Sequence, residues 1–72
     1  MNDYHAEVSP LMTCAEVADL FKVTVGTVRR YANAGKLGRF LRPGGSEYRF
    51  YRFHVTHAYL GGTFDKDGNP SL

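Results

Sequence analysis

The sequence has a single cysteine, Cys14, and no tryptophan among its 72 residues. One cysteine cannot form an internal disulfide, so we expect a protein of a reducing compartment, such as the cytoplasm. No apolar run approaches the roughly 20 residues that a membrane-spanning helix needs, so no membrane span is expected. The opening stretch MNDYHAEVSP has neither an apolar run nor a basic leader, and we therefore expect no signal peptide.

Acidic residues are almost missing from the middle of the chain. Eight of the nine lysines and arginines lie between residues 22 and 52, where Glu47 is the only acid. This segment carries a net charge of about +7 inside a nearly neutral chain. A long basic segment interleaved with aromatic residues and turns favours a polyanionic partner, and double-stranded DNA is the main candidate. The alternative is a solvated basic face.

Two short helices are predicted in the first half of the chain. In LMTCAEVADLF, Thr13 is the N-cap and Glu16 completes a capping box, so a helix follows that ends near Phe21. After a tight turn, Thr24 is the N-cap of a second helix, and Gly35 is its left-handed C-terminal residue. Two short helices joined by a turn of about three residues form a helix-turn-helix.

The hydrophobic period changes after the second helix. Residues 38–42 and 47–52 have the pattern of two short strands, and the turn signal PGGS separates them at 43–46. A weakly capped third helix is predicted in FHVTHAYLGG, with Val55 and the two residues Tyr59 and Leu60 packed inward.

These elements predict a single small domain. The expected fold class is α+β and mostly helical: a winged helix-turn-helix with two short helices, a two-stranded β-hairpin wing and a short C-terminal helix. We expect a flexible N-terminal arm at residues 1–10, the DNA-binding domain at 11–62 and a flexible tail at 63–72. The tail motif DKDGN begins like a calcium loop. However, Pro70 stands at the sixth position, where the loop needs glycine, and the final glutamate is missing, so a turn or a disordered end is predicted.

The second helix has the pattern of a DNA-reading element. Neighbouring residues on a helix are about 100° apart, so Arg30 lies about 200° from the core position Val28 and faces away from the core. A helix in the major groove offers its outward residues to base edges and its flanks to phosphates. We expect Arg30 to read a base, most naturally guanine, and Arg29 and Thr27 to bind phosphates. Gly26 either permits close approach to DNA or is tolerated near the helix start. The expected DNA-binding residues are Thr24, Gly26, Thr27, Arg29, Arg30 and Asn33.

The predicted hairpin forms a thin cationic finger with a bare Gly-Gly tip. Arginines on such a finger fit a minor groove or its phosphates. Of the aromatic residues nearby, Phe40, Phe50 and Phe53 are expected to pack in the core, whereas Tyr48 and Tyr51 are left open. The expected DNA-binding residues of the wing are Arg39, Arg42, Gly44, Gly45, Ser46 and Arg49.

Little in the sequence favours metal or catalytic chemistry. His54 and His57 are three residues apart, but no cysteine pair or His-Glu-x-x-His accompanies them, so they are interpreted as surface or boundary histidines. Cys14 has no base or orienting acid suggested beside it and is interpreted as a packed small residue. We expect no metal, no cofactor and no enzymatic activity.

The stretch LMTCAEVADLFKVTVGTVRRYANAGKLGRFLRPGGSEYRF resembles the winged helix-turn-helix domains of the excisionase and MerR superfamily. The likeness covers residues 11 to about 60, and the lack of an effector domain or coiled coil favours an excisionase, also called a recombination directionality factor. This resemblance implies a non-catalytic, DNA-bending protein of a bacteriophage or mobile element. Such a protein binds repeated sites, often cooperatively, and helps an integrase to excise DNA.

Carried over by residue, the resemblance places the DNA-contacting helix at Thr24 to Asn33 and the wing at Arg39 to Arg49. Glu47 departs from the family pattern, in which wings are usually basic or polar. Two other functions remain open from the sequence. The first is a small winged-helix transcriptional regulator, and the second is a protein-interaction module whose basic face meets an acidic protein.

Overall fold

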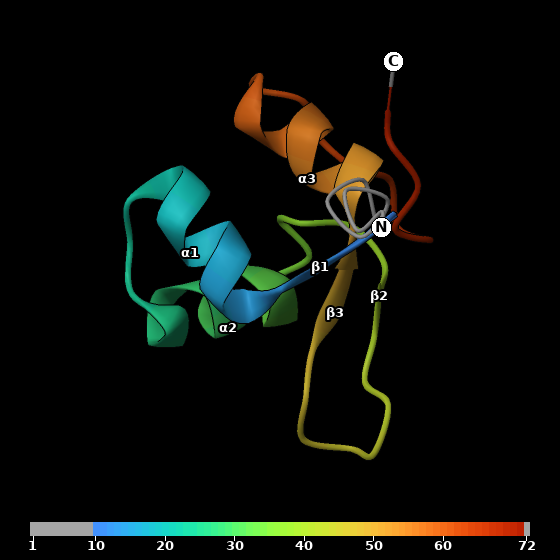
Figure 1. Cartoon of the computed structure of the whole chain (residues 1–72). Helices are drawn as coiled ribbons and strands as arrows, with labels where there is room; N and C mark the ends of the chain where they lie inside the picture. The colour runs from blue at the N-terminus through green and yellow to red at the C-terminus, as the bar shows by residue number, and fades with distance from the viewer. Residues whose placement is uncertain (1–9, 72) are drawn as a thin grey trace, which may run out of the picture.

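A computed structural model describes residues 10–71, so all of the expected N-terminal arm except Pro10 lies outside the described residues. Figure 1 shows three short helices beside a small antiparallel sheet, from which a hairpin extends away from the helices. The predicted α+β fold class, a small winged helix-turn-helix, is confirmed. Across residues 10–71, no helix has the length and apolarity needed to cross a bilayer. The elements are β1 (Leu11–Thr13), α1 (Cys14–Phe21), α2 (Val25–Asn33), β2 (Phe40–Leu41), β3 (Arg49–Tyr51) and α3 (Arg52–Tyr59).

The ends of α1 and α2 are set by short-range hydrogen bonds that the sequence predicted. Oγ1 of Thr13 accepts the N–H of Glu16 at 3.1 Å, and the Glu16 carboxylate accepts the N–H of Thr13 at 2.8 Å, which completes the capping box. At the end of α2, Gly35 has φ of +79°, as expected of a left-handed C-terminal glycine. The N–H groups of Gly35 and Lys36 donate to Ala32 and Tyr31, which closes a Schellman motif.

The sheet has a third strand that the sequence did not predict. Its order is β1-β3-β2, with Met12 opposite Phe50 on one side of β3 and Phe40 opposite Phe50 on the other. The predicted hairpin is therefore present, with strands shorter than expected, but β1 extends the two-stranded wing into a sheet. A strand of three residues is too short to show a period of its own in the sequence.

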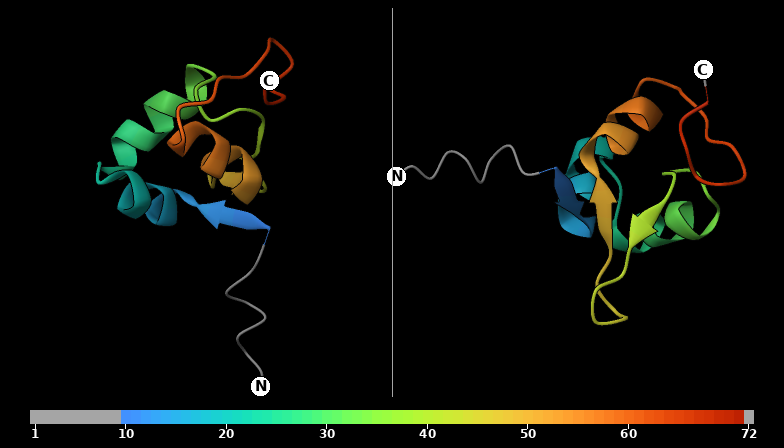
Figure 2. Two further views of the ribbon diagram at one scale, coloured as in Figure 1. Left: turned by 90° about the horizontal axis from the view of Figure 1, so that it is seen from above. Right: turned by 90° about the vertical axis from the view of Figure 1, so that its right-hand side faces the viewer.

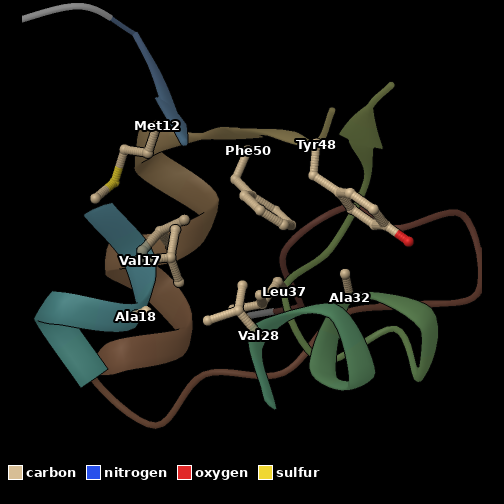
Figure 3. Packing of buried hydrophobic residues seen from close by; sticks show 9 residues of the cluster. Met12, Val17, Ala18, Val28, Ala32, Leu37, Tyr48 and Phe50 are labelled. Carbon is tan, nitrogen blue, oxygen red and sulfur yellow. The ribbon is translucent and has the colours of Figure 1, made fainter. Parts of the chain in front are cut away.

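The core lies between the helix-turn-helix and the sheet. Figure 3 shows Val17 from α1, Val28 from α2 and Phe50 from β3 pointing toward one another, and each is fully buried. The two helices thus pack against one face of the sheet. The outer face of α2 is the side of the helix that points away from the sheet. The buried apolar residues are Met12, Val17, Ala18, Val28, Ala32, Leu37, Tyr48, Phe50 and Val55.

The packing of α3 corrects several predictions. Val55 is buried as expected, but Tyr59 and Leu60 are 54% and 77% exposed, so the expectation that they pack inward is wrong. Phe53, expected in the core, is 64% exposed. Its inward place is taken by His54, which is 1% exposed and not a surface histidine. The reason is a long-range contact: the His54 ring lies against the segment that leads into β2 and hydrogen-bonds to it.

Residues 63–71 fold back onto the domain, which differs from the expected flexible tail. The carboxylate of Asp65 accepts the N–H groups of Asp67 and Asn69 at 2.9 and 3.0 Å, so this turn is held by its own aspartate. Gly68 then accepts the N–H of Arg39 at 3.0 Å. Both views of Figure 2 show the segment (red) beside the stretch between α2 and β2. The tail therefore supports the base of the wing.

Candidate nucleic-acid interface

The outer face of α2 is polar, basic and exposed. Val28 and Ala32 are 0% and 2% exposed, and they fix which side of the helix faces the core. Arg29, Arg30 and Asn33 lie on the other side and are exposed, in agreement with the helical periodicity of the sequence. This face carries two guanidinium groups and one carboxamide, all of which donate hydrogen bonds. Such a face can bind an anionic surface that has acceptors.

Three side chains near the start of α2 form a continuous hydrogen-bonded line. Oγ1 of Thr24 caps the helix by accepting the N–H of Thr27 at 3.2 Å. The two threonine hydroxyls lie 3.0 Å apart, and Nη2 of Arg30 donates to Oγ1 of Thr27 at 2.9 Å. The spacing of three residues puts these side chains on one edge of the helix. The spacing of three residues is present in the sequence, from which Thr27 was expected to bind a phosphate.

Gly26 lies in the first turn of α2 and is exposed. A Cβ built there would meet only Oγ1 of Thr24, at the ordinary contact distance of 3.9 Å. Packing within the described residues therefore does not require a glycine at this position. Both earlier interpretations, close approach of a partner and simple tolerance, remain predictions.

Two of the wing arginines, Arg42 and Arg49, contact the hairpin itself. Arg42 donates from Nη2 to the carbonyl of Gly45 at 2.6 Å, and its guanidinium lies over the Tyr48 ring, 4.8 Å from the centroid. Arg49 pairs with Glu47 at 3.1 Å and donates to the carbonyl of Tyr48 at 2.9 Å. Arg42 therefore braces the turn, and Glu47 offsets the charge of Arg49. The expected cationic finger therefore has two of its arginines, Arg42 and Arg49, held by contacts within the hairpin.

The tip of the wing is open. Gly44 and Gly45 have φ of +74° and +84°, and a Cβ built at either position would have no neighbour within 4 Å. These glycines are present because the turn needs left-handed backbone, which L side chains rarely adopt. Ser46 is exposed beside them. The two glycines therefore add no side-chain bulk to the tip.

A cluster of three aromatic rings lies on the inner side of the wing. The centroids of Phe40, Tyr48 and Phe50 form a triangle, with distances of 5.2 Å (Phe40–Tyr48), 6.0 Å (Tyr48–Phe50) and 5.7 Å (Phe40–Phe50). Tyr48, which the sequence left open, is buried at 8% exposure and belongs to the core. Since the guanidinium of Arg42 lies over the Tyr48 ring, the arginine is positioned by an aromatic face.

Arg39 is placed at the wing base by its backbone. Its N–H donates to Gly68 and its carbonyl accepts from Nδ1 of His54, whereas its side chain is exposed. Burial lowers the pKa of His54 from 6.5, and the hydrogen bond to the Arg39 carbonyl opposes that shift. The contacts of His54 and Gly68 with Arg39 could not be predicted from the sequence, because both join distant parts of the chain. Within residues 10–71, no three His, Cys, Asp or Glu side chains gather into a group suited to a metal ion.

The fold and this basic face define a winged helix-turn-helix protein. The chain matches the model of the helix-turn-helix domain family over residues 11–57, about two thirds of its length. It belongs to that family, and its domain is of the DNA-binding helix-turn-helix type. Comparisons with curated proteins and with solved structures gave no match. Which residues contact DNA stays a prediction.

Proposed function

We propose that this protein is a sequence-specific, non-catalytic excisionase that bends DNA beside a recombination site. The observation that carries the proposal is the exposed face of α2, on which Arg30, Arg29 and Asn33 point away from the buried Val28. A helix seated in the major groove reads base edges with such a face, and an arginine suits the O6 and N7 acceptors of guanine. Arg30 is the base reader in this proposal, and Arg29 binds a phosphate.

The wing is proposed to bind the neighbouring minor groove or its phosphates. Its glycine tip is narrow and exposed, and the exposed side chain of Arg39 and the partly exposed side chain of Arg49 add positive charge behind the tip. Two elements that enter adjacent grooves from one rigid domain favour a bent duplex, because bending increases the surface in contact. About six phosphate contacts would make binding strongly dependent on salt.

The more specific role, excisionase, is supported by two observations. The resemblance over residues 11 to about 60 is to the winged helix-turn-helix domains of the excisionase and MerR superfamily, and the helix-turn-helix family matched over 11–57 is one in which excisionase-like proteins occur. In this role the protein would bind repeated sites cooperatively on DNA in the bacterial cytoplasm. It would promote the excision that a partner integrase catalyses and would perform no chemistry of its own.

The first experiment measures binding to random duplex DNA at 50 and 200 mM salt. The proposal expects affinity at low salt that falls by a factor of about 10³ or more at high salt. Lys66→Ala is a matched control, since it removes one positive charge from the tail turn and leaves α2 and the wing intact. Absence of DNA affinity at low salt would remove every nucleic-acid function and leave an interaction module for acidic proteins.

The second experiment tests the recombination role directly. A purified integrase and its attachment-site DNA are incubated with wild-type protein, with Arg30→Ala or with Lys66→Ala, and excised product is counted against integrated product. The wild type and Lys66→Ala should shift the reaction toward excision, and Arg30→Ala should not. If the direction of recombination is indifferent to the wild-type protein, the excisionase role is wrong even though DNA binding stands.

A further inference from the structure

The guanidinium of Arg30 is tied to the first turn of its own helix. Nη2 of Arg30 donates to Oγ1 of Thr27 at 2.9 Å, and that oxygen lies 3.0 Å from Oγ1 of Thr24. Thr24 is itself fixed, because its oxygen caps α2 by accepting the N–H of Thr27 at 3.2 Å. The hydrogen bonds therefore run from Thr24, the N-cap, through the hydroxyl of Thr27 to the guanidinium of Arg30.

We infer that Thr27 is a positioning residue that aims Arg30 at its base, in place of the phosphate contact expected from the sequence. The inference rests on the proposed function, in which Arg30 reads a base. A free arginine has many rotamers and loses that freedom when it docks. A hydrogen bond already present in the unbound protein removes part of this loss and favours the rotamer that follows the helix edge.

The donors of Arg30 are sufficient for both tasks. Its guanidinium has five N–H donors in a planar fork, and Thr27 takes one of them. The remaining edge can still make the bidentate contact to guanine O6 and N7. The hydroxyl of Thr27 thus holds the arginine without competing for the base.

The hydroxyl protons give the line a second consequence. Arg30 can only donate, so Oγ1 of Thr27 accepts from it. One of the two threonine protons fills the contact between Thr24 and Thr27, whichever residue donates. Within the part of the chain that the structure describes, the other proton is left for an outside acceptor. Whichever threonine donates, Oγ1 of Thr27 still accepts from Arg30, so base discrimination depends on Thr27 through Arg30.

The test uses Thr27→Val, which keeps the branched shape and removes the hydroxyl, and Thr27→Ser, which keeps the hydroxyl. A preferred site is first selected from random duplex DNA with the wild-type protein. Dissociation constants are then measured for that site and for each single base-pair change. Thermal melting identifies any loss of fold. Because valine and threonine have similar helix propensities, α2 should be retained in both variants.

The inference expects a local loss of specificity. Arg30→Ala should relax one base position, and Thr27→Val should reduce discrimination at that same position by about threefold to tenfold, part of what a bidentate contact provides. Thr27→Ser should restore it. In the Arg30→Ala background, Thr27→Val should change that discrimination no further, because the two residues act as one unit.

Other results overturn the inference and identify what failed. If Thr27→Val weakens all sequences by one factor, Thr27 is a phosphate contact and not a positioning residue. If Thr27→Val leaves the position relaxed by Arg30→Ala fully discriminated, the inference fails while the proposed function stands. If the wild-type protein selects no sequence, the proposed function is removed and the inference with it.

Discussion

The carbonyl oxygen of Arg39 accepts a hydrogen bond from Nδ1 of His54 at 3.3 Å, which ties α3 to the residue that leads into the wing. The proton must be on Nδ1 for this bond, because a carbonyl can only accept. Nε2 of the same ring is buried and has no hydrogen-bond partner among residues 10–71. The neutral ring therefore fits this place, and a second proton on Nε2 would be buried without an acceptor.

Acid is expected to destabilise the fold through His54. Burial lowers its pKa from 6.5, more than the hydrogen bond to Arg39 raises it, and the charges of Arg39 and His57 lower it further. The unfolded chain thus binds a proton near pH 6.5 that the folded chain resists. The contribution of His54 to the free energy of unfolding should be fully present above about pH 6.5. As the pH falls below that value, the free energy of unfolding should decrease by at most about 1.4 kcal/mol per pH unit for this one group.

Urea unfolding at pH 7.5, 6.0 and 5.0 measures this effect. His54→Gln keeps an amide donor for the Arg39 carbonyl and removes the titration, so its stability should change less than that of the wild type between pH 7.5 and 5.0. Equal slopes for the wild type and His54→Gln would show that another group causes the acid dependence.

Arg30 and Arg29 are adjacent in sequence but should fail differently when they are truncated. Both side chains are exposed, yet only Arg30 is held by Thr27. Arg30→Ala should cost about 1–3 kcal/mol at one base position and relax specificity there. Arg29→Ala should weaken all sequences alike and reduce the slope of log affinity against log salt by about 1. Binding titrations on the selected site and on its single base-pair variants separate the two. Equal losses on every sequence for both variants would contradict the division of roles.

Glu47 should limit the affinity of the wing for DNA of any sequence. Its carboxylate pairs with Arg49 at 3.1 Å and competes with phosphate for that guanidinium. Glu47→Gln should therefore raise affinity for random duplex and steepen the salt dependence by about one phosphate contact, a slope change of about 0.9. Asp67→Asn changes the net charge equally in the tail turn and should have a smaller effect. Equal gains for the two variants would point to net charge alone.

The parts of the fold that the sequence predicted depend on neighbours within a few residues. The capping box of Thr13 and Glu16, the cap at Thr24 and the left-handed Gly35 are all closed by bonds that span three to five residues. Such signals are legible because the partner is on the same short stretch. The orientation of α2 followed from its period for the same reason, since Val28 and Ala32 are one turn apart.

The parts of the fold that the sequence did not predict depend on contacts between residues far apart in the chain. Met12 forms a strand because Phe50 offers an unpaired edge, and three residues carry no period that could indicate this. His54 is buried because its ring hydrogen-bonds to the Arg39 carbonyl. The position of that carbonyl is set by the tail, residues 63–71, and by the stretch between α2 and β2. The pairing of Glu47 with Arg49 is an exception, since the two residues are only two positions apart and their contact depends on side-chain rotamers that the sequence does not show.

Two glycines with nearly the same backbone conformation should differ in how they tolerate alanine. Gly35 and Gly38 have φ of +79° and +76°. A Cβ at Gly35 has no neighbour within 4 Å, whereas a Cβ at Gly38 would lie 2.6 Å from the Phe64 ring and 2.9 Å from Nδ1 of His54. Gly35→Ala should therefore cost only the left-handed strain, about 1–2 kcal/mol.

Gly38→Ala should cost that strain and about a further 1–3 kcal/mol, because the added methyl must displace two packed rings. In a domain of this size, each kcal/mol lowers the melting temperature by about 4–8 °C, so the two variants are separable by thermal melting. Gly38→Ala in a Phe64→Ala background removes the nearer ring and should recover part of the difference, since the two sites then no longer clash. If Gly35→Ala and Gly38→Ala have the same melting temperature, Phe64 is not packed against the stretch between α2 and β2. The tail then does not support the base of the wing.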